Sequence, residues 1–248
     1  MEDDVYLVVG DDYAAFARPP SVLTQSQLGT MLHNGADFSG ARVFMGQGMD
    51  LAVGPLLRER LAGLGAAEVA LAPPRAPLEL THKRHTDYVL VSEPQRVDSR
   101  WRFALLVDDG ADRLSDHVTG QHMGAMLLIE AARQAVIASI ERHCPRADGA
   151  SWGLILQRLD CKFDTYAFPL PTEVSVGVVE SGTGDGQREL VLDVLFLQAG
   201  KRVSGIDFHV GLCRRDLLSR IEGRHAARAV AEALRQLSPK GAEAGLAG

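Results

Sequence analysis

Several features that would assign a protein class are missing from this sequence of 248 residues. It has three cysteines, Cys144, Cys161 and Cys213, and no C-x-x-C pair, which predicts buried or half-buried thiols rather than a zinc site or a disulfide framework. No apolar run approaches the ~20 residues of a membrane span, and the acidic N-terminus does not resemble a signal peptide. The formal net charge of −6 argues against nucleic acid or an anionic membrane as the main partner. We therefore expect a cytoplasmic protein without a metal or a cofactor.

What the sequence does contain is enough apolar material for a real core. Hydrophobic residues make up 46% of the chain and charged residues 23%, which fits one large or two small globular domains. The first 77 residues alternate between strand-like and helix-like segments, a pattern typical of a small parallel α/β unit. The expected elements are strands at 5–9, 41–45 and 68–72 and helices at 26–33 and 50–64, the second capped by Asp50 and ended by Gly65.

Prolines at positions 73, 74 and 77 favour an extended linker, so we place a domain boundary after residue 77. Over residues 78–213 the pattern predicts two strands, one long helix at 123–143 and four more strands, with a polar helical tail at 214–248. The strands are expected at 88–91, 101–107, 154–166, 173–180, 189–197 and 203–212. Because the long helix is apolar almost all round, we expect it to be enclosed. This order predicts an α+β architecture, the hot-dog domain, in which an antiparallel sheet wraps around a long central helix, here preceded by the α/β unit.

Two glycine-rich segments bear on nucleotide binding. Gly46-Gln47-Gly48 follows an expected strand and precedes an expected helix, as in half of a dinucleotide fingerprint, but position 51 is Leu51 rather than glycine. Packing is therefore the default role of this loop. The segment 181–187 joins two expected strands and does not open a helix, so it predicts a hairpin turn.

Three polar side chains interrupt the apolar long helix. Glu130, Arg133 and Gln134 lie at positions i, i+3 and i+4 and therefore share one face of the helix. A buried carboxylate is strongly unfavourable unless it is paired or protonated, so Glu130 must have partners. The pattern indicates either a structural Glu–Arg pair or a functional site on this helix.

The loop before the long helix carries further candidates. Gly120 and Gly124 are either ordinary turn glycines or small residues that let a ligand approach the first-turn N–H groups, as in an oxyanion hole. His117 and His122 both precede the helix, and one of them could be a general base. Asp116 could orient His117 or cap the loop, whereas His122 is expected to pack in the first turn. Elsewhere, His82 and His85 lie three residues apart on an expected strand. Their side chains would face opposite sides of the strand, which does not suit a shared metal ion.

The sequence resembles a known family at these same residues. Asp116-His117-Val118, followed by G-x-x-L-L-x-E-A-A-R-Q over 124–134, is similar to the signature of the A-factor synthase hot-dog family. Thr81-His82-Lys83 and the segment 88–98, YVLVSEPQRVD, resemble the opening strand and turn of that family. The resemblance covers about residues 80–213 and rests on motif order, spacing and fold order together.

The resemblance implies an acyl transfer. A β-ketoacyl group would pass from an acyl carrier protein or coenzyme A thioester to a hydroxyl of a three-carbon phosphate such as dihydroxyacetone phosphate, on the way to a butyrolactone or butenolide signal. It implies a base or orienting role for Glu130, a role for Arg133 in holding Glu130 ionised or meeting a phosphate, and a geometric role for Gln134. Lys83 is a further candidate for an anionic substrate. His117 matches the histidine of the family signature, so the resemblance makes it the better candidate for the general base.

The sequence also departs from that family, whose members usually carry two hot-dog repeats, because only one is visible here. A more distant similarity links the segment to β-hydroxyacyl-carrier-protein dehydratases, but the prolines of their loop are missing. The alternatives are a dehydratase or thioesterase acting on acyl thioesters, or a non-catalytic hot-dog dimer that binds an acyl ligand. Since a lone hot-dog sheet leaves an edge unpaired, we expect a homodimer with the site at its interface.

Overall fold

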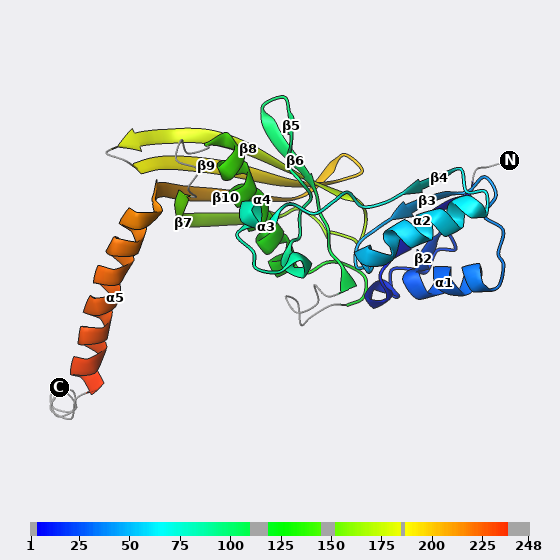
Figure 1. The fold of residues 1–248 in the computed structure, drawn as a ribbon, viewed down its shortest axis with the longest axis horizontal. Helices are drawn as coiled ribbons and strands as arrows, with labels where there is room; N and C mark the ends of the chain where they lie inside the picture. Colours follow the sequence, from blue (N-terminus) through cyan, green and yellow to red (C-terminus); the bar gives the residue numbers. More distant parts are fainter. Residues whose placement is uncertain (1–3, 110–118, 145–151, 185–186, 238–248) are drawn as a thin grey trace.

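The computed structural model describes residues 4–109, 119–144, 152–184 and 187–237 of the chain. Figure 1 shows a small α/β unit at the N-terminal end, a larger curved sheet beside it with a helix against one face, and a final helix that projects away from both. The sheet and its central helix confirm the hot-dog architecture.

The N-terminal unit is a four-stranded parallel sheet in the order β2-β1-β3-β4. Its strands are β1 (Val5–Val9), β2 (Val22–Thr24), β3 (Arg42–Met45) and β4 (Glu68–Ala70), and its helices are α1 (Gln25–His33) and α2 (Gly54–Gly63). Short 3₁₀ turns occupy Asp11–Tyr13 and Leu51–Val53. The expected parallel α/β unit is confirmed, while β2 escaped prediction because three residues carry no readable periodicity.

Local sequence signals set the helix limits in this unit. Thr24 and Gln27 form a capping box at the start of α1, with the Thr24 hydroxyl accepting from the Gln27 N–H at 3.2 Å. The Asp50 carboxylate accepts from the Ala52 N–H at 2.9 Å, so it caps the 3₁₀ turn that leads into α2 rather than α2 itself. Gly65, with φ of +83°, ends the helical segment as predicted.

The second sheet is antiparallel, in the order β5-β6-β8-β9-β10-β7. Its strands are β5 (Gln95–Val97), β6 (Arg100–Ala104), β7 (Trp152–Phe163), β8 (Thr172–Gly184), β9 (Gln187–Gln198) and β10 (Lys201–Arg214). The long helix α4 (Ala125–His143) packs against it. Pairing of β8 with β9 confirms the hairpin expected around 181–187.

The core lies between α4 and the sheet. Alternate residues of β8, β9 and β10 point inward, as period-2 patterning requires, and meet the apolar face of α4. Fully buried members include Val174, Leu192, Phe196, Ile206, Leu128 and Ala135. The helix is not enclosed on every side, however, since the side chain of Met126 is 63% exposed. One side of the first turn of α4 is therefore open to solvent, while Leu127 and Leu128 are buried, which corrects the expectation of a fully enclosed helix.

The segment before β5 differs from its prediction. Residues 88–91 are not a strand: a 3₁₀ turn covers Thr86–Tyr88, and Val91 makes only an isolated bridge to Leu105. His82 follows the short helix α3 (Leu78–Thr81) with φ of 53°, so it does not lie on a strand either. The physical reason is that the backbone partners here are mixed and form no continuous ladder. The N–H of Leu90 bonds to the side chain of Gln134, whereas the carbonyls of Leu90 and Val91 accept from the N–H groups of Leu106 and Ala76.

The loop Gly46–Gln47–Gly48 joins the two sheets. The Gln47 amide donates to the carbonyl of Leu105 at 3.1 Å and accepts from the N–H of Val107 at 2.8 Å, and the Gly48 N–H donates to the Val107 carbonyl at 2.8 Å. A side chain at Gly46 would place a Cβ 2.3 Å from the carbonyl oxygen of Pro169. The glycines therefore allow close approach of two backbones, and the structure gives this loop a packing role.

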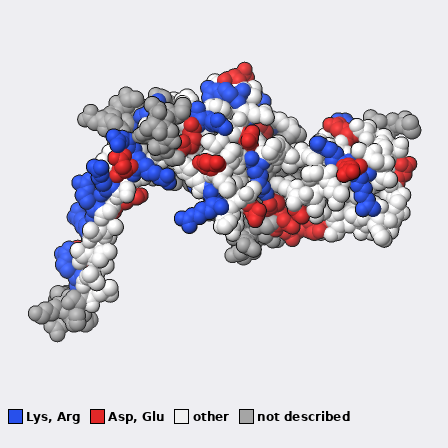
Figure 2. Space-filling model, viewed as in Figure 1, with Lys and Arg blue, Asp and Glu red and all other residues white. Residues whose placement is uncertain are grey.

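The C-terminal helix α5 (Arg215–Leu237) begins directly after β10. Its first turns lie against the sheet, where a Cβ on Gly153 of β7 would be 2.8 Å from the side chain of Leu218. Its later turns stand away from the rest of the chain, with basic side chains along one side (Figures 1 and 2). Among the described helices, none combines the length and apolarity that a membrane crossing requires.

Candidate functional site

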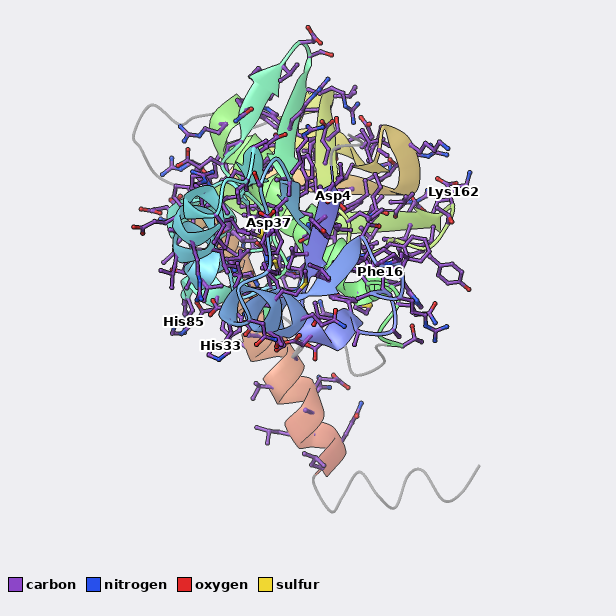
Figure 3. All side chains as sticks on the ribbon, turned by 90° about the vertical axis from the view of Figure 1, so that its right-hand side faces the viewer. Asp4, Phe16, His33, Asp37, His85 and Lys162 are labelled. Atoms are coloured by element: carbon purple, nitrogen blue, oxygen red, sulfur yellow. The ribbon has the colours of Figure 1, made fainter. Side chains whose placement is uncertain are left out.

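The structure brings four of the predicted site residues together. Glu130, Arg133 and Gln134 extend from one face of α4, and Lys83 reaches them from the turn that follows α3. This turn belongs to the segment 82–90, which lies along α4. His85, at the surface of the same segment, lies across the molecule from Lys162 of the edge strand β7 (Figure 3). His85 therefore lies far from the Lys162 end of β7.

Glu130 is the centre of this cluster. Its Oε1 atom is 2.6 Å from Nζ of Lys83 and accepts hydrogen bonds from Nη2 of Arg133 at 2.8 Å and from Nε2 of Gln134 at 3.0 Å. Its Oε2 atom accepts from Nε of Arg133 at 2.8 Å, so the Arg133 contact is bidentate. The side chain of Glu130 is 19% exposed, whereas those of Lys83 and Arg133 are 21% and 40% exposed. One carboxylate thus holds two cations whose outer sides face solvent.

Gln134 attaches the covering segment to the helix. Its Oε1 atom accepts from the N–H of Leu90 at 2.8 Å, and its Nε2 atom donates to the carbonyl of Tyr88 at 2.9 Å as well as to Glu130. The side chain is fully buried, so all of these bonds form in a low-dielectric environment. Gln134 thereby fixes the segment that carries Lys83, and its geometric role in a reaction stays a prediction.

The electrostatics of the cluster follow from these contacts. Burial alone raises the pKa of Glu130, but hydrogen bonds from Arg133, Lys83 and Gln134 outweigh it and lower the pKa to about 2. The hydrogen bond to Glu130 in turn raises the pKa of Arg133. At neutral pH the site holds two positive charges and one negative charge, and a carboxylate with so low a pKa is a weak base. The arrangement suits the orientation of cations better than the removal of a proton.

The remaining predicted residues are not part of this cluster. Gly120, with φ of +71°, faces the N-terminal unit, where a Cβ would be 3.1 Å from the carbonyl oxygen of Asp12, and its own carbonyl accepts from the N–H of Phe16 at 3.0 Å. Its small size therefore serves packing between the two units. Gly124 is the N-cap of α4, in an extended conformation and without a side chain that could cover the first-turn N–H groups.

The predicted histidines have different outcomes. The ring of His122 lies 4.8 Å from the ring of Tyr166, and its Nδ1 atom is 3.2 Å from Oγ1 of Thr119, which agrees with the expected packing role. Asp116 and His117 lie outside the described residues. Within the described parts of the chain, no group of three or more side chains has the arrangement that a metal ion requires.

Sequence reasoning missed one further pair on the same face of α4. Nε2 of His82 is 3.0 Å from Oε1 of Glu141, and both side chains are largely buried. Glu141 lies eleven positions after Glu130, or about three helical turns, so the spacing of the two glutamates already indicated a shared face. What the spacing does not give is the identity of the covering segment.

Comparisons with known proteins agree with the fold. The model of the A-factor biosynthesis hotdog domain family matches residues 66–213, and no curated protein sequence matches the chain.

Similar solved structures include a mutant thioesterase from Pseudomonas aeruginosa, with 10% identity, a TM-score of 0.38, and coverage of 50% of this chain and 81% of that chain. A conserved protein from the same organism has 14% identity and a TM-score of 0.39, covering 55% of this chain and 99% of its own. A dehydratase heterocomplex from Xenorhabdus doucetiae has 13% identity and a TM-score of 0.45. The match covers 59% of this chain and 97% of that chain.

Proposed function

We propose that this chain, which belongs to the A-factor biosynthesis hotdog domain family, is an enzyme that acts on acyl thioesters. Its proposed reaction is acyl transfer. The acyl group would be a β-ketoacyl group held on an acyl carrier protein or coenzyme A, and the acceptor a hydroxyl of a three-carbon phosphate such as dihydroxyacetone phosphate. The ester product is of the kind that leads to butyrolactone or butenolide signals in secondary metabolism.

One observation carries this proposal: two cations, Lys83 and Arg133, are held side by side on the ionised carboxylate of Glu130 with their outer sides exposed. The local excess of positive charge favours an anionic substrate, and the guanidinium of Arg133 can meet phosphate oxygens through two parallel hydrogen bonds. Acceptor phosphates and phosphopantetheine-linked thioesters both carry such groups. A purely structural pair needs one cation for one carboxylate, not two.

In the proposed reaction the acceptor hydroxyl attacks the thioester carbonyl, a base takes the hydroxyl proton, and the thiolate leaves as the ester bond forms. Glu130 has the orienting role rather than the role of the base, because a pKa of about 2 leaves it little affinity for a proton. His117 remains the proposed base. The N–H groups of the first turn of α4, next to Gly124, are proposed to stabilise the oxyanion.

A second candidate is a non-catalytic hot-dog protein that binds an acyl ligand. The favouring observation is that both carboxylate oxygens of Glu130 already have partners within the protein, as a structural ion-pair network would. Dehydratase or thioesterase chemistry remains the alternative reaction for the same thioester substrate class.

We also propose that the protein is a homodimer. The edge strand β7 has 12 residues and pairs only with β10 among the described strands, and Leu156 and Phe163 on it are exposed. A two-fold axis beside β7 would join two sheets edge to edge. The expected placement of the site at the dimer interface stays a prediction; the contacts that hold the Lys83–Glu130 cluster together form within one chain.

The experiment is a mass-spectrometric assay with a β-ketoacyl thioester of carrier protein or coenzyme A, with and without dihydroxyacetone phosphate. Ester formation that needs the acceptor supports acyl transfer, free acid without acceptor indicates a thioesterase, and loss of water from a hydroxyacyl thioester indicates a dehydratase. Arg133→Gln should reduce the transfer rate about 10²-fold, as misplacement of a substrate does. The matched control is Arg142→Gln, which changes an exposed arginine of the same helix. Full activity of Arg133→Gln would contradict the proposal.

A further inference from the structure

A second candidate site lies outside the Lys83–Glu130 cluster. A cleft of about 760 Å³ separates the N-terminal unit from the end of the hot-dog sheet, and no residue of that cluster lines it. One wall is formed by the ends of β3 and β4 and the residues that follow them, and the other by β5, β6 and the start of β8. Such clefts between two packed units are common places for small-molecule sites.

The position of the cleft in the parallel sheet also favours a ligand. In open α/β sheets, ligands bind outside the carboxyl ends of the strands, mostly where the strand order reverses. Here the order reverses between β1 and β3, but that point is filled, because Gln47 bonds to the hot-dog backbone there. What stays open is the carboxyl end of β3 and β4, which is the cleft.

An apolar chamber extends the cleft toward α2. This second cavity, of about 210 Å³, shares six lining residues with the cleft, namely Met45, Leu51, Leu71, Ala72, Pro73 and Pro74. Its two charged lining residues are engaged within the protein, since the Asp50 carboxylate accepts from the Ala52 N–H and Arg75 pairs with Asp108. The chamber therefore suits an aliphatic chain and not a charged group.

The mouth of the cleft is polar but does not favour an anion. Arg102 lies 3.5 Å from Glu173, which neutralises it, and the exposed Glu93 adds a further negative charge. Gln95 presents an exposed neutral amide at the same mouth. A ligand head with a hydroxyl or ester group can bond to the amide of Gln95 without being repelled by the carboxylates.

We propose that this cleft binds an uncharged amphiphile, with its aliphatic chain in the chamber and a neutral hydroxyl or ester head at Gln95. Because both units line the cleft, the bound ligand would bridge them. This site is separate from the acyl-transfer site, and the proposal does not depend on that function.

The test is titration calorimetry on the full chain with 1-monodecanoylglycerol as the neutral probe and decanoate as its anionic counterpart. The neutral probe should bind at least tenfold more tightly than decanoate. Ala72→Phe, which fills the chamber without adding charge, and Leu71→Asp, which places a carboxylate in it, should each weaken binding of the neutral probe at least tenfold. The matched control is Leu56→Asp on the exposed side of α2, which should bind as the unchanged protein does.

Melting curves check that each variant is folded. If Leu71→Asp does not fold, Ala72→Phe still decides the test. Arg133→Gln separates the two sites, because it should leave binding of the neutral probe unchanged. Loss of binding in Arg133→Gln would place the amphiphile at the acyl-transfer site and overturn the proposal. Equal binding of decanoate, or normal binding by Ala72→Phe, would overturn it as well.

Discussion

The two faces of α4 are held in place by different means. The face toward the sheet is apolar apart from the buried Ser139, with Leu127, Ala131 and Ala135 packed in the core with inward-facing side chains of β8, β9 and β10. The adjoining polar face carries Glu130, Gln134 and Glu141, which bond to the segment 82–90. Apolar packing is additive and tolerant of exchange, whereas each polar contact depends on one partner. The first face stabilises the fold, and the second specifies where one loop lies.

The largest expected effect is on the apolar face. Leu127→Ala removes a side chain that is 3% exposed and should lower the free energy of unfolding by about 2–5 kcal/mol, because a buried cavity remains. Chemical denaturation measures this loss. Met126→Ala is the matched control at the adjacent position. Because this side chain is exposed, the free energy of unfolding should change by no more than about 0.5 kcal/mol. Equal values for the two variants would mean that the two positions do not differ in burial.

A smaller loss of stability is expected on the polar face. Glu130→Gln keeps the shape and some hydrogen bonds but leaves Lys83 and Arg133 without their carboxylate. The free energy of unfolding should therefore fall by about 1–3 kcal/mol. The acyl-transfer rate should fall with it, since both cations lose their orientation. Melting and turnover are measured on the same preparation. Unchanged turnover per folded molecule with a clear loss of stability would leave a purely structural network.

The sequence predicted the two faces unequally. Periodicity located α4 and most of the strands, and the spacing of Glu130, Arg133 and Gln134 predicted a shared polar face. It did not predict that Lys83 reaches Glu130, because nothing in a single sequence pairs a loop with a distant helix. The segment 88–91 was expected to be a strand from its valines and leucine, but the Leu90 N–H and the Tyr88 carbonyl bond to the Gln134 side chain, which interrupts the ladder. A tertiary contact there overrides local propensity.

Acid should reduce the contribution that Glu130 makes to the free energy of unfolding. The pKa of Glu130 is lowered from 4.5 to about 2 in the folded protein, so its contribution to stability is complete above pH 4.5 and is lost as the pH falls toward 2. The stability difference between the unchanged protein and Glu130→Gln should therefore shrink over this range. Denaturation of both proteins at several pH values measures that difference. The other carboxylates titrate in both proteins, so their effects on stability largely cancel in it. A difference that is constant down to pH 2 would contradict the lowered pKa.

The smallest effect is expected at the far end of the polar face. Glu141 lies on the same side of α4 as Glu130, but its partner is His82, which carries a charge only when protonated, whereas Glu130 faces two permanent cations. Glu141→Gln keeps an amide oxygen that can still accept from Nε2 of His82, so the free energy of unfolding should change by about 0–1 kcal/mol. Turnover should stay near that of the unchanged protein, because no cation of the proposed substrate site depends on Glu141. A loss of turnover as large as that of Glu130→Gln would mean that the polar face acts as one unit and that the covering segment, rather than the Lys83–Arg133 pair, controls the reaction.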